Sequence, residues 1–169
     1  TMAMMACPSG FSASPTGACF MVTTDRTTHW DCAALCGANA SLACISSAED
    51  NEFVASLVPS NPGDVPYLHH ELWLGGYKAS DGGGYRAEPD APYGYKCASG
   101  QPMNYTAWSI ADREPNDRRS NTNGLSSDCA KILVHGADGS PDGAWAVGPC
   151  ADSRRCVCEY GAGPSEDYV

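Results

Sequence analysis

"ELWLGG", residues 71–76, is the stretch that decides the fold. A short apolar run that contains a tryptophan and ends at paired glycines is typical of a strand in the core of a domain. Two helical patterns precede this strand, and a long loop-like stretch with further strands follows it. We therefore expect an α+β domain in which two helices come first and short strands follow around a long loop region.

The first helix is expected within "TTHWDCAALCG", residues 27–37. Thr28 and Asp31 fit a capping box, and Gly37 fits the residue that ends a helix. "SLACI", residues 41–45, then reads as a short strand. The stretch 46–59 predicts a second helix, capped by Ser46 with Glu49 and ended by a proline.

Residues 79–128 are rich in Gly, Pro, Asp, Asn and Ser and lack apolar periodicity. Such a stretch inside a compact domain indicates a functional or disulfide-pinned loop region. Strands are expected again within 129–136, 143–150 and 154–160. We expect residues 1–6 to be an N-terminal extension, 7–160 one domain, and 161–169 an exposed tail.

The charge of the chain restricts its partners. The 169 residues carry 10 Lys and Arg against 20 Asp and Glu, a net charge of -10. Nucleic-acid binding needs a basic face, so that class is excluded. No apolar run approaches the roughly 20 residues that span a bilayer, so we expect no membrane span in this chain.

Ten dispersed cysteines indicate a disulfide framework and an oxidising compartment. The spacings C-x3-C at Cys32 and C-x-C at Cys156 do not resemble a zinc site. Two sequons, at Asn39 and Asn104, agree with this compartment as glycosylation candidates. We expect a protein that is secreted, at the cell surface or in another oxidising lumen.

The motifs together resemble the C-type lectin-like domain across roughly residues 7–160. The resemblance is carried by "CPSGF", "W-x-x-A-x-x-C" from Trp30, "LACI", "ELWLGG", "EPND", "DCAKI", "GAW" and "CVCE". It implies two helices flanking small sheets, with a long loop at one end. It also places Trp30, Trp73, Trp108 and Trp145 in the core.

The resemblance implies three disulfides, Cys7–Cys19, Cys36–Cys158 and Cys129–Cys150. Four cysteines remain, which allow three pairings. Cys156 lies on the same strand face as Cys158, so it could reach either Cys32 or Cys44. We favour Cys44–Cys156 and leave the partner of Cys97 open.

Sugar-binding members of the family hold one calcium with Glu and Asn of an EPN motif, an acid before the "DC" cysteine, and Asn-Asp after a Trp. Glu114 and Asn116 match the first part. Ser127 replaces the acid and Ala146-Val147 replaces Asn-Asp, whereas calcium takes about 6 to 8 oxygens. The candidate metal set is Glu114, Asn116 and Asp128; Asp117, Asp138 and Asp142 are further acids that could substitute for the missing ligands.

A second hypothesis rests on arginines in the same loop. Guanidinium groups bind sulfate, carboxylate and phosphate bidentately. The two hypotheses together give the candidate ligand-binding residues of the loop, which are Glu114, Asn116, Asp117, Arg118 and Arg119. The alternative is that these arginines pair with neighbouring acids.

These patterns predict a non-enzymatic recognition module. It would bind a mannose-type or acidic glycan, or a protein, through the loop, with calcium as a possible cofactor. A structural subunit of a larger complex is the alternative, favoured by the insertion at residues 79–96. Ice binding ranks third, because the loop is charged rather than lined by regularly spaced threonines.

Overall fold

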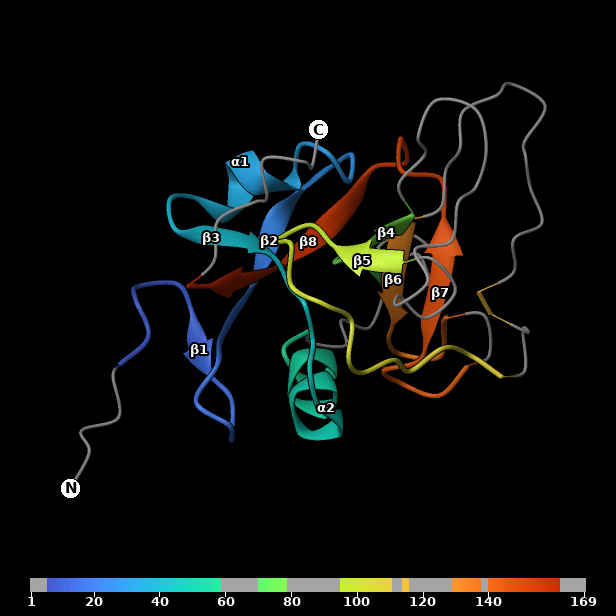
Figure 1. Ribbon diagram of the computed structural model, residues 1–169, viewed down its shortest axis with the longest axis horizontal. Coiled ribbons are helices and arrows are strands. Elements are labelled where there is room, and N and C mark those ends of the chain that lie inside the picture. Colours follow the sequence, from blue (N-terminus) through green and yellow to red (C-terminus); the bar gives the residue numbers. More distant parts are fainter. Residues whose placement is uncertain are drawn as a thin grey trace.

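The computed structural model describes residues 6–58, 70–78, 95–110, 114–115, 129–137 and 140–161. Within these ranges the α+β expectation is confirmed, because the structure has two helices in the first part of the chain and eight strands (Figure 1). The helices are α1 Cys32–Cys36 and α2 Ala48–Ser56. The strands are β1 Ser12–Ala13, β2 Cys19–Thr27, β3 Ala40–Leu42, β4 Glu71–Lys78, β5 Tyr95–Cys97, β6 Cys129–Leu133, β7 Trp145–Gly148 and β8 Arg154–Tyr160.

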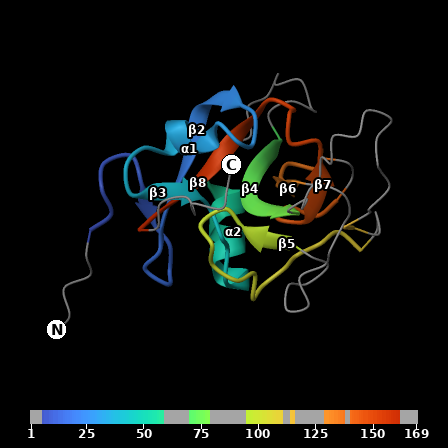
Figure 2. The same ribbon diagram turned by 45° about the horizontal axis from the view of Figure 1, so that its top comes forward.

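The strands are joined into one mixed sheet, in the order β1-β2-β8-β4-β6-β7. The parallel pair β4 and β8, in register at Trp73 and Cys156, links two antiparallel groups. Beyond this pair the two strands diverge, so that β8 continues beside β3 and β4 continues beside β5. The sheet therefore has a fork between β3 and β5 (Figure 2).

Successive side chains of a strand point to opposite faces of the sheet, so the buried residues form two layers, one on each face. Leu72, Leu74 and Val157 belong to the layer that contains Val54 and Ala55 of α2. Trp73, Cys156 and Cys158 belong to the layer that contains Cys32 and Cys36 of α1. The two helices therefore cover opposite faces of the sheet, as their positions in Figure 1 show. Neither helix is long and apolar enough to cross a membrane.

Five disulfides brace these layers. The three that the resemblance implied are present, namely Cys7–Cys19, Cys36–Cys158 and Cys129–Cys150. The preferred pairing Cys44–Cys156 is wrong. Cys156 bonds instead to Cys32, and Cys44 bonds to Cys97 of β5.

The geometry of α1 and β8 explains the correction. Cys32 and Cys36 are one helical turn apart, a rise of about 6 Å. Cys156 and Cys158 are two strand residues apart, about 6.6 Å. The two pairs therefore match, and two bridges run side by side between α1 and β8.

Both helix starts differ from the expectation by a small shift. Thr28 and Asp31 are hydrogen-bonded to each other, as a capping box suggests, but α1 begins only at Cys32. Helix α2 is capped by Ser47, whose Oγ accepts the Asp50 N–H at 3.2 Å, and not by Ser46.

The tryptophans follow the expectation with one exception. Trp73 and Trp145 are buried, and Trp108 packs against the core. Trp30 is 42% exposed, so its expected core position is wrong. The neighbouring His29 is buried instead, and its ring meets Trp73 edge-on at 5.4 Å between centroids.

Candidate functional site

Glu114, the first residue of the EPN motif, lies within the described part of the chain, beside β7. The Glu114–Pro115 peptide bond is cis. The Glu114 backbone N–H donates to the Ser109 carbonyl at 2.9 Å. Its Oε2 accepts the Val147 backbone N–H at 3.2 Å, so the carboxylate is directed at the edge of the sheet.

The segment before Glu114 is fixed to the same strand. Trp145 donates its backbone N–H to the Ala107 carbonyl and accepts the Ser109 N–H on its own carbonyl, both at 2.8 Å. The indole Nε1 of Trp145 donates to Asn51 Oδ1 of α2 at 2.7 Å. Hydrogen bonds therefore connect Glu114 to β7, and β7 to α2.

The described residues at this base do not fit the family's calcium set. Ala146 and Val147 stand where the Asn-Asp pair is expected, and neither carries a side-chain oxygen. Asp142 accepts the Gly136 N–H at 3.2 Å and lines a pocket beside α2. Among the described residues, no group of three or more His, Cys, Asp or Glu could hold a metal ion.

The other proposed ligand residues lie outside the described ranges. They are Asn116, Asp117, Arg118, Arg119 and Asp128, together with the neighbouring Arg113, Ser127 and Asp138. The metal hypothesis for Asn116 and Asp128, and the anion hypothesis for the arginines, both remain predictions.

Glu71 and Arg154 have a structural role. Glu71 Oε2 accepts Lys131 Nζ at 3.0 Å and Arg154 Nη2 at 2.9 Å. The Arg154 guanidinium also lies 4.7 Å from the centre of a Trp73 ring. Glu71 and Arg154 are therefore committed to an ion-pair network on the sheet rather than to a ligand.

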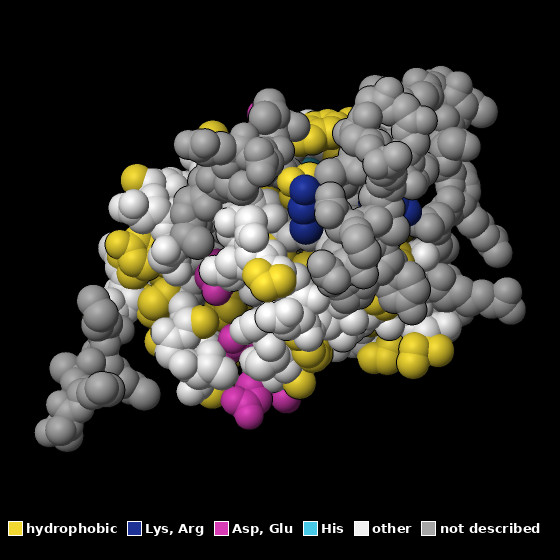
Figure 3. Space-filling view, in the orientation of Figure 1, with side chains coloured by type: hydrophobic (Ala, Val, Ile, Leu, Met, Phe, Trp, Pro, Cys, Tyr) yellow, Lys and Arg dark blue, Asp and Glu magenta, His cyan; other side chains and the backbone are white. Residues whose placement is uncertain are grey.

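Acidic side chains dominate elsewhere on the described surface. Glu49 and Glu52 of α2 are exposed, and on the face shown in Figure 3 the acidic side chains gather in the region of α2. Both sequon asparagines, Asn39 and Asn104, are also exposed, so each is accessible for glycosylation.

Burial shifts the pKa of two described groups. Desolvation lowers the pKa of His29 from 6.5 to about 4, although its hydrogen bond to Leu74 acts in the opposite direction. His29 Nε2 lies 2.7 Å from that carbonyl oxygen. Burial also raises the pKa of Glu159, whose Oε2 accepts the Cys44 N–H at 3.0 Å.

The fold and the disulfides, with a loop base anchored on β7, define the class as a lectin-like domain. The family model described as the lectin C-type domain matches residues 25–160, and the chain belongs to this family. A comparison with curated proteins gave no significant match.

Several solved structures share the fold. Human lithostathine is 21% identical with a TM-score of 0.64, covering 95% of this chain and 94% of that one. Ovocleidin-17, a major protein of the Gallus gallus eggshell calcified layer, is 20% identical with a TM-score of 0.62, covering 92% and 99%. The carbohydrate-recognition domain of the mouse scavenger receptor C-type lectin is 17% identical with a TM-score of 0.64, covering 92% and 98%. At these identities the likeness concerns the fold alone.

The sequence pointed to Glu114 but not to its partner. A backbone N–H carries no sequence signature, so the contact with Val147 could not be read from the motif. The sequence held only an indirect indication of this contact. Ala146 and Val147 lack the side-chain oxygens of the family motif, so Glu114 was left without the expected calcium ligands on β7.

Proposed function

We propose that the chain is a non-enzymatic recognition module of an oxidising, extracellular or lumenal compartment. It binds a carbohydrate or protein ligand through the loop that surrounds Glu114, and it does so without calcium. The observation that carries the proposal is the contact between Glu114 Oε2 and the Val147 N–H. This contact uses a carboxylate oxygen that a calcium-binding relative would direct to the ion.

The physical reason is the number of oxygen ligands. Calcium affinity follows the count of charged ligands and the rigidity of the site. Ala146 and Val147 remove two side-chain ligands from β7. A direct hydrogen bond between Glu114 and β7 supplies part of the connection that the ion would make between loop and strand. Groups that are held in place before binding lower the entropic cost of ligand binding, and Glu114 is held in this way on β7.

Thermal unfolding tests the calcium part of the proposal. We expect calcium to leave the Tm unchanged, both without mannose and at a fixed mannose concentration, because a ligand that binds only the folded state would raise Tm through RT ln(1 + [L]/Kd). A calcium-dependent rise in Tm that grows with mannose would contradict the proposal.

Glycan binding in EDTA tests the ligand part. Mannose-type, sulfated and sialylated glycans are immobilised, and binding of the wild type is compared with that of Arg118→Ala/Arg119→Ala. Retention of an acidic glycan in EDTA that the double variant loses supports recognition by the arginines. If no glycan is retained, a protein ligand remains, and a native mass above that of one chain would favour the structural-subunit alternative.

A further inference from the structure

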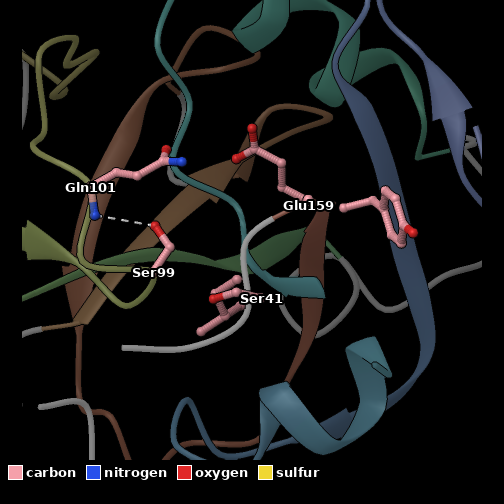
Figure 4. Close-up of a pocket in the computed structure, with 7 residues that line it drawn as sticks. Ser41, Ser99, Gln101 and Glu159 are labelled. Carbon is pink, nitrogen blue, oxygen red and sulfur yellow. Dashed lines mark hydrogen bonds between the residues drawn. The ribbon is translucent and has the colours of Figure 1, made fainter. Parts of the chain in front are cut away.

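The sequon Asn39-Ala40-Ser41 crosses from an exposed turn into the buried strand β3. Asn39 is exposed, so the folded domain has room for a glycan on its side chain. Ser41 differs, because the residue is 1% exposed and its Oγ is buried. A cavity of about 200 Å³ lies beside this part of β3 (Figure 4), but it does not uncover the hydroxyl.

Attachment of an N-linked glycan involves both ends of a sequon. The acceptor motif requires a hydroxyl at its third position, so the transferase must reach that hydroxyl as well as the asparagine. In the reaction, the asparagine amide nitrogen forms a bond to C1 of the first sugar of a lipid-diphosphate-linked oligosaccharide. The bond between C1 and the diphosphate oxygen breaks, the lipid diphosphate leaves with the electron pair, and the amide nitrogen loses one proton.

The sequon is closed by strand pairing with the end of the domain. β3 pairs with β8 along its whole length. Just beyond this pairing, the Gly161 N–H donates to the Asn39 carbonyl at 2.8 Å. The disulfide Cys36–Cys158 also ties β8 to α1, directly before the sequon. In the folded domain, the Ser41 hydroxyl therefore lies inside a disulfide-braced part of the sheet.

The order of synthesis leaves a period in which the sequon is open. Cys36 and Cys158 are 122 residues apart in the chain. Because chains grow at about 5–20 residues per second, β8 is made about 6–24 s after the sequon. During this period β3 has no β8 to pair with, so both the asparagine and the hydroxyl are accessible.

We propose that Asn39 is an N-glycosylation site that accepts its glycan only before β8 pairs with β3. The folded domain then carries the glycan on Asn39 but is not an acceptor at this position. β3 and β7 lie on opposite sides of the molecule (Figure 1), so this glycan leaves the loop base at Glu114 uncovered. The proposal goes beyond the recognition function and does not depend on it.

The second sequon provides a comparison within the same chain. Residues 104–106 belong to no helix or strand, and Thr106 is partly exposed. Because β8 pairs with β3 and not with this segment, transfer to Asn104 should depend less on whether the domain is folded.

Glycan transfer in vitro tests the proposal. Unglycosylated, oxidised protein from a bacterial host and the same chain after reduction and alkylation are each incubated with a purified oligosaccharyltransferase and its lipid-linked donor. Glycopeptide mass spectrometry measures the initial rates at Asn39 and Asn104. We expect transfer to Asn39 to be at least about tenfold slower in the folded protein, because an opening that costs about 1.4 kcal/mol leaves roughly one tenth of the molecules reactive.

Two matched variants assign each signal to its sequon. Ser41→Ala should abolish transfer to Asn39 in the unfolded chain and leave transfer to Asn104 unchanged. Thr106→Ala should do the reverse, and it should keep the difference between folded and unfolded protein at Asn39.

Equal rates at Asn39 in the folded and unfolded proteins would overturn the proposal, because burial of Ser41 would then not limit transfer. An unfolded chain that is modified at Asn104 but not at Asn39 would also overturn it. A loss of equal size at both sequons on folding would reject β3–β8 pairing as the cause. The measurement involves no ligand of the loop around Glu114, so its failure leaves the recognition proposal unaffected.

Discussion

At the residue scale, His29 is a neutral imidazole in a fully buried position. Its ring packs against Trp73, and its Nε2 lies within hydrogen-bond distance of the Leu74 carbonyl. Because its pKa is about 4 in the folded state, against 6.5 when exposed, the unfolded chain binds a proton that the folded chain refuses. Lowering the pH between these values therefore favours unfolding.

We expect the His29→Gln variant to lose this pH dependence, because glutamine does not titrate and its amide can donate to Leu74. Each pKa unit corresponds to about 1.4 kcal/mol, so the wild type should lose roughly 3 kcal/mol relative to the variant between pH 6.5 and 4. Urea unfolding of both proteins at pH 7, 5 and 4 measures the difference.

Glu159 is a second buried group whose titration affects stability in the same pH experiment. Its pKa is raised, so its contribution to stability is fully present below its unfolded pKa and is lost as the pH rises through its folded pKa. This effect opposes that of His29 and is the same in both proteins. Parallel pH profiles for wild type and variant would show that His29 does not control acid stability.

At the element scale, the start of α2 shows how far local patterns reach. Both Ser46 and Ser47 have an acid three residues later, so the sequence fits a cap at either position. The structure selects Ser47, and Asp50 also accepts the Thr16 hydroxyl at 2.7 Å. That contact joins the N-terminal hairpin to the helix and has no local sequence signature.

Replacement of the two serines separates the alternatives. Ser47→Ala should cost about 1 kcal/mol of folding stability, because the Asp50 N–H loses its acceptor. Ser46→Ala is the matched control and should change stability by less than about 0.5 kcal/mol, as an exposed residue without a cap contact. Chemical unfolding of both variants measures these losses. A larger loss of stability for Ser46→Ala than for Ser47→Ala would mean that Ser46 caps the helix, as the sequence pattern predicted.

The strands were predictable to different degrees. β4 and β6 are mostly apolar and buried, and β8 has a buried centre of Cys156, Val157 and Cys158, so composition indicated all three strands. β5 has three residues and follows a Gly- and Pro-rich stretch, so it is too short to show the alternation of apolar and polar residues that indicates a strand. Cys97 was therefore left without a partner, although Cys97 lies beside Gly76 of β4 and bonds to Cys44.

The candidate site was predictable only in part. Motif order identified Glu114, and the missing oxygens at Ala146 and Val147 indicated a weak calcium set. The hydrogen bond to Val147 depends on how distant segments of the chain meet, which the motif does not show.

At the scale of the whole molecule, two disulfides connect α1 with β8. Cys32–Cys156 and Cys36–Cys158 span 124 and 122 residues, so each one closes nearly the whole domain into a loop. When one of these disulfides is intact, forming the second closes only a small loop, because its cysteines lie close in sequence to those of the first. Their contributions to stability are therefore strongly coupled.

We expect removal of either bridge by paired Cys→Ala substitution to cost roughly 3 kcal/mol or less. Removal of the second should cost about 5 kcal/mol more, the value for a loop above 100 residues. Thermal unfolding of the two single-bridge variants and the double variant measures this coupling. Strictly additive losses would mean that the bridges act through local packing rather than through chain entropy.

The position of Glu114 has a consequence for solubility. Among the strands that the structure describes, β7 is the last in the sheet, and an open edge strand is a template for pairing with a second chain. The outward backbone groups of Trp145 are bonded to Ala107 and Ser109, and that of Val147 to Glu114. Loss of the Glu114 carboxylate would leave a free N–H on this edge, where another molecule could add a strand. We therefore expect the Glu114 carboxylate to lower the tendency of this edge to pair with a second chain.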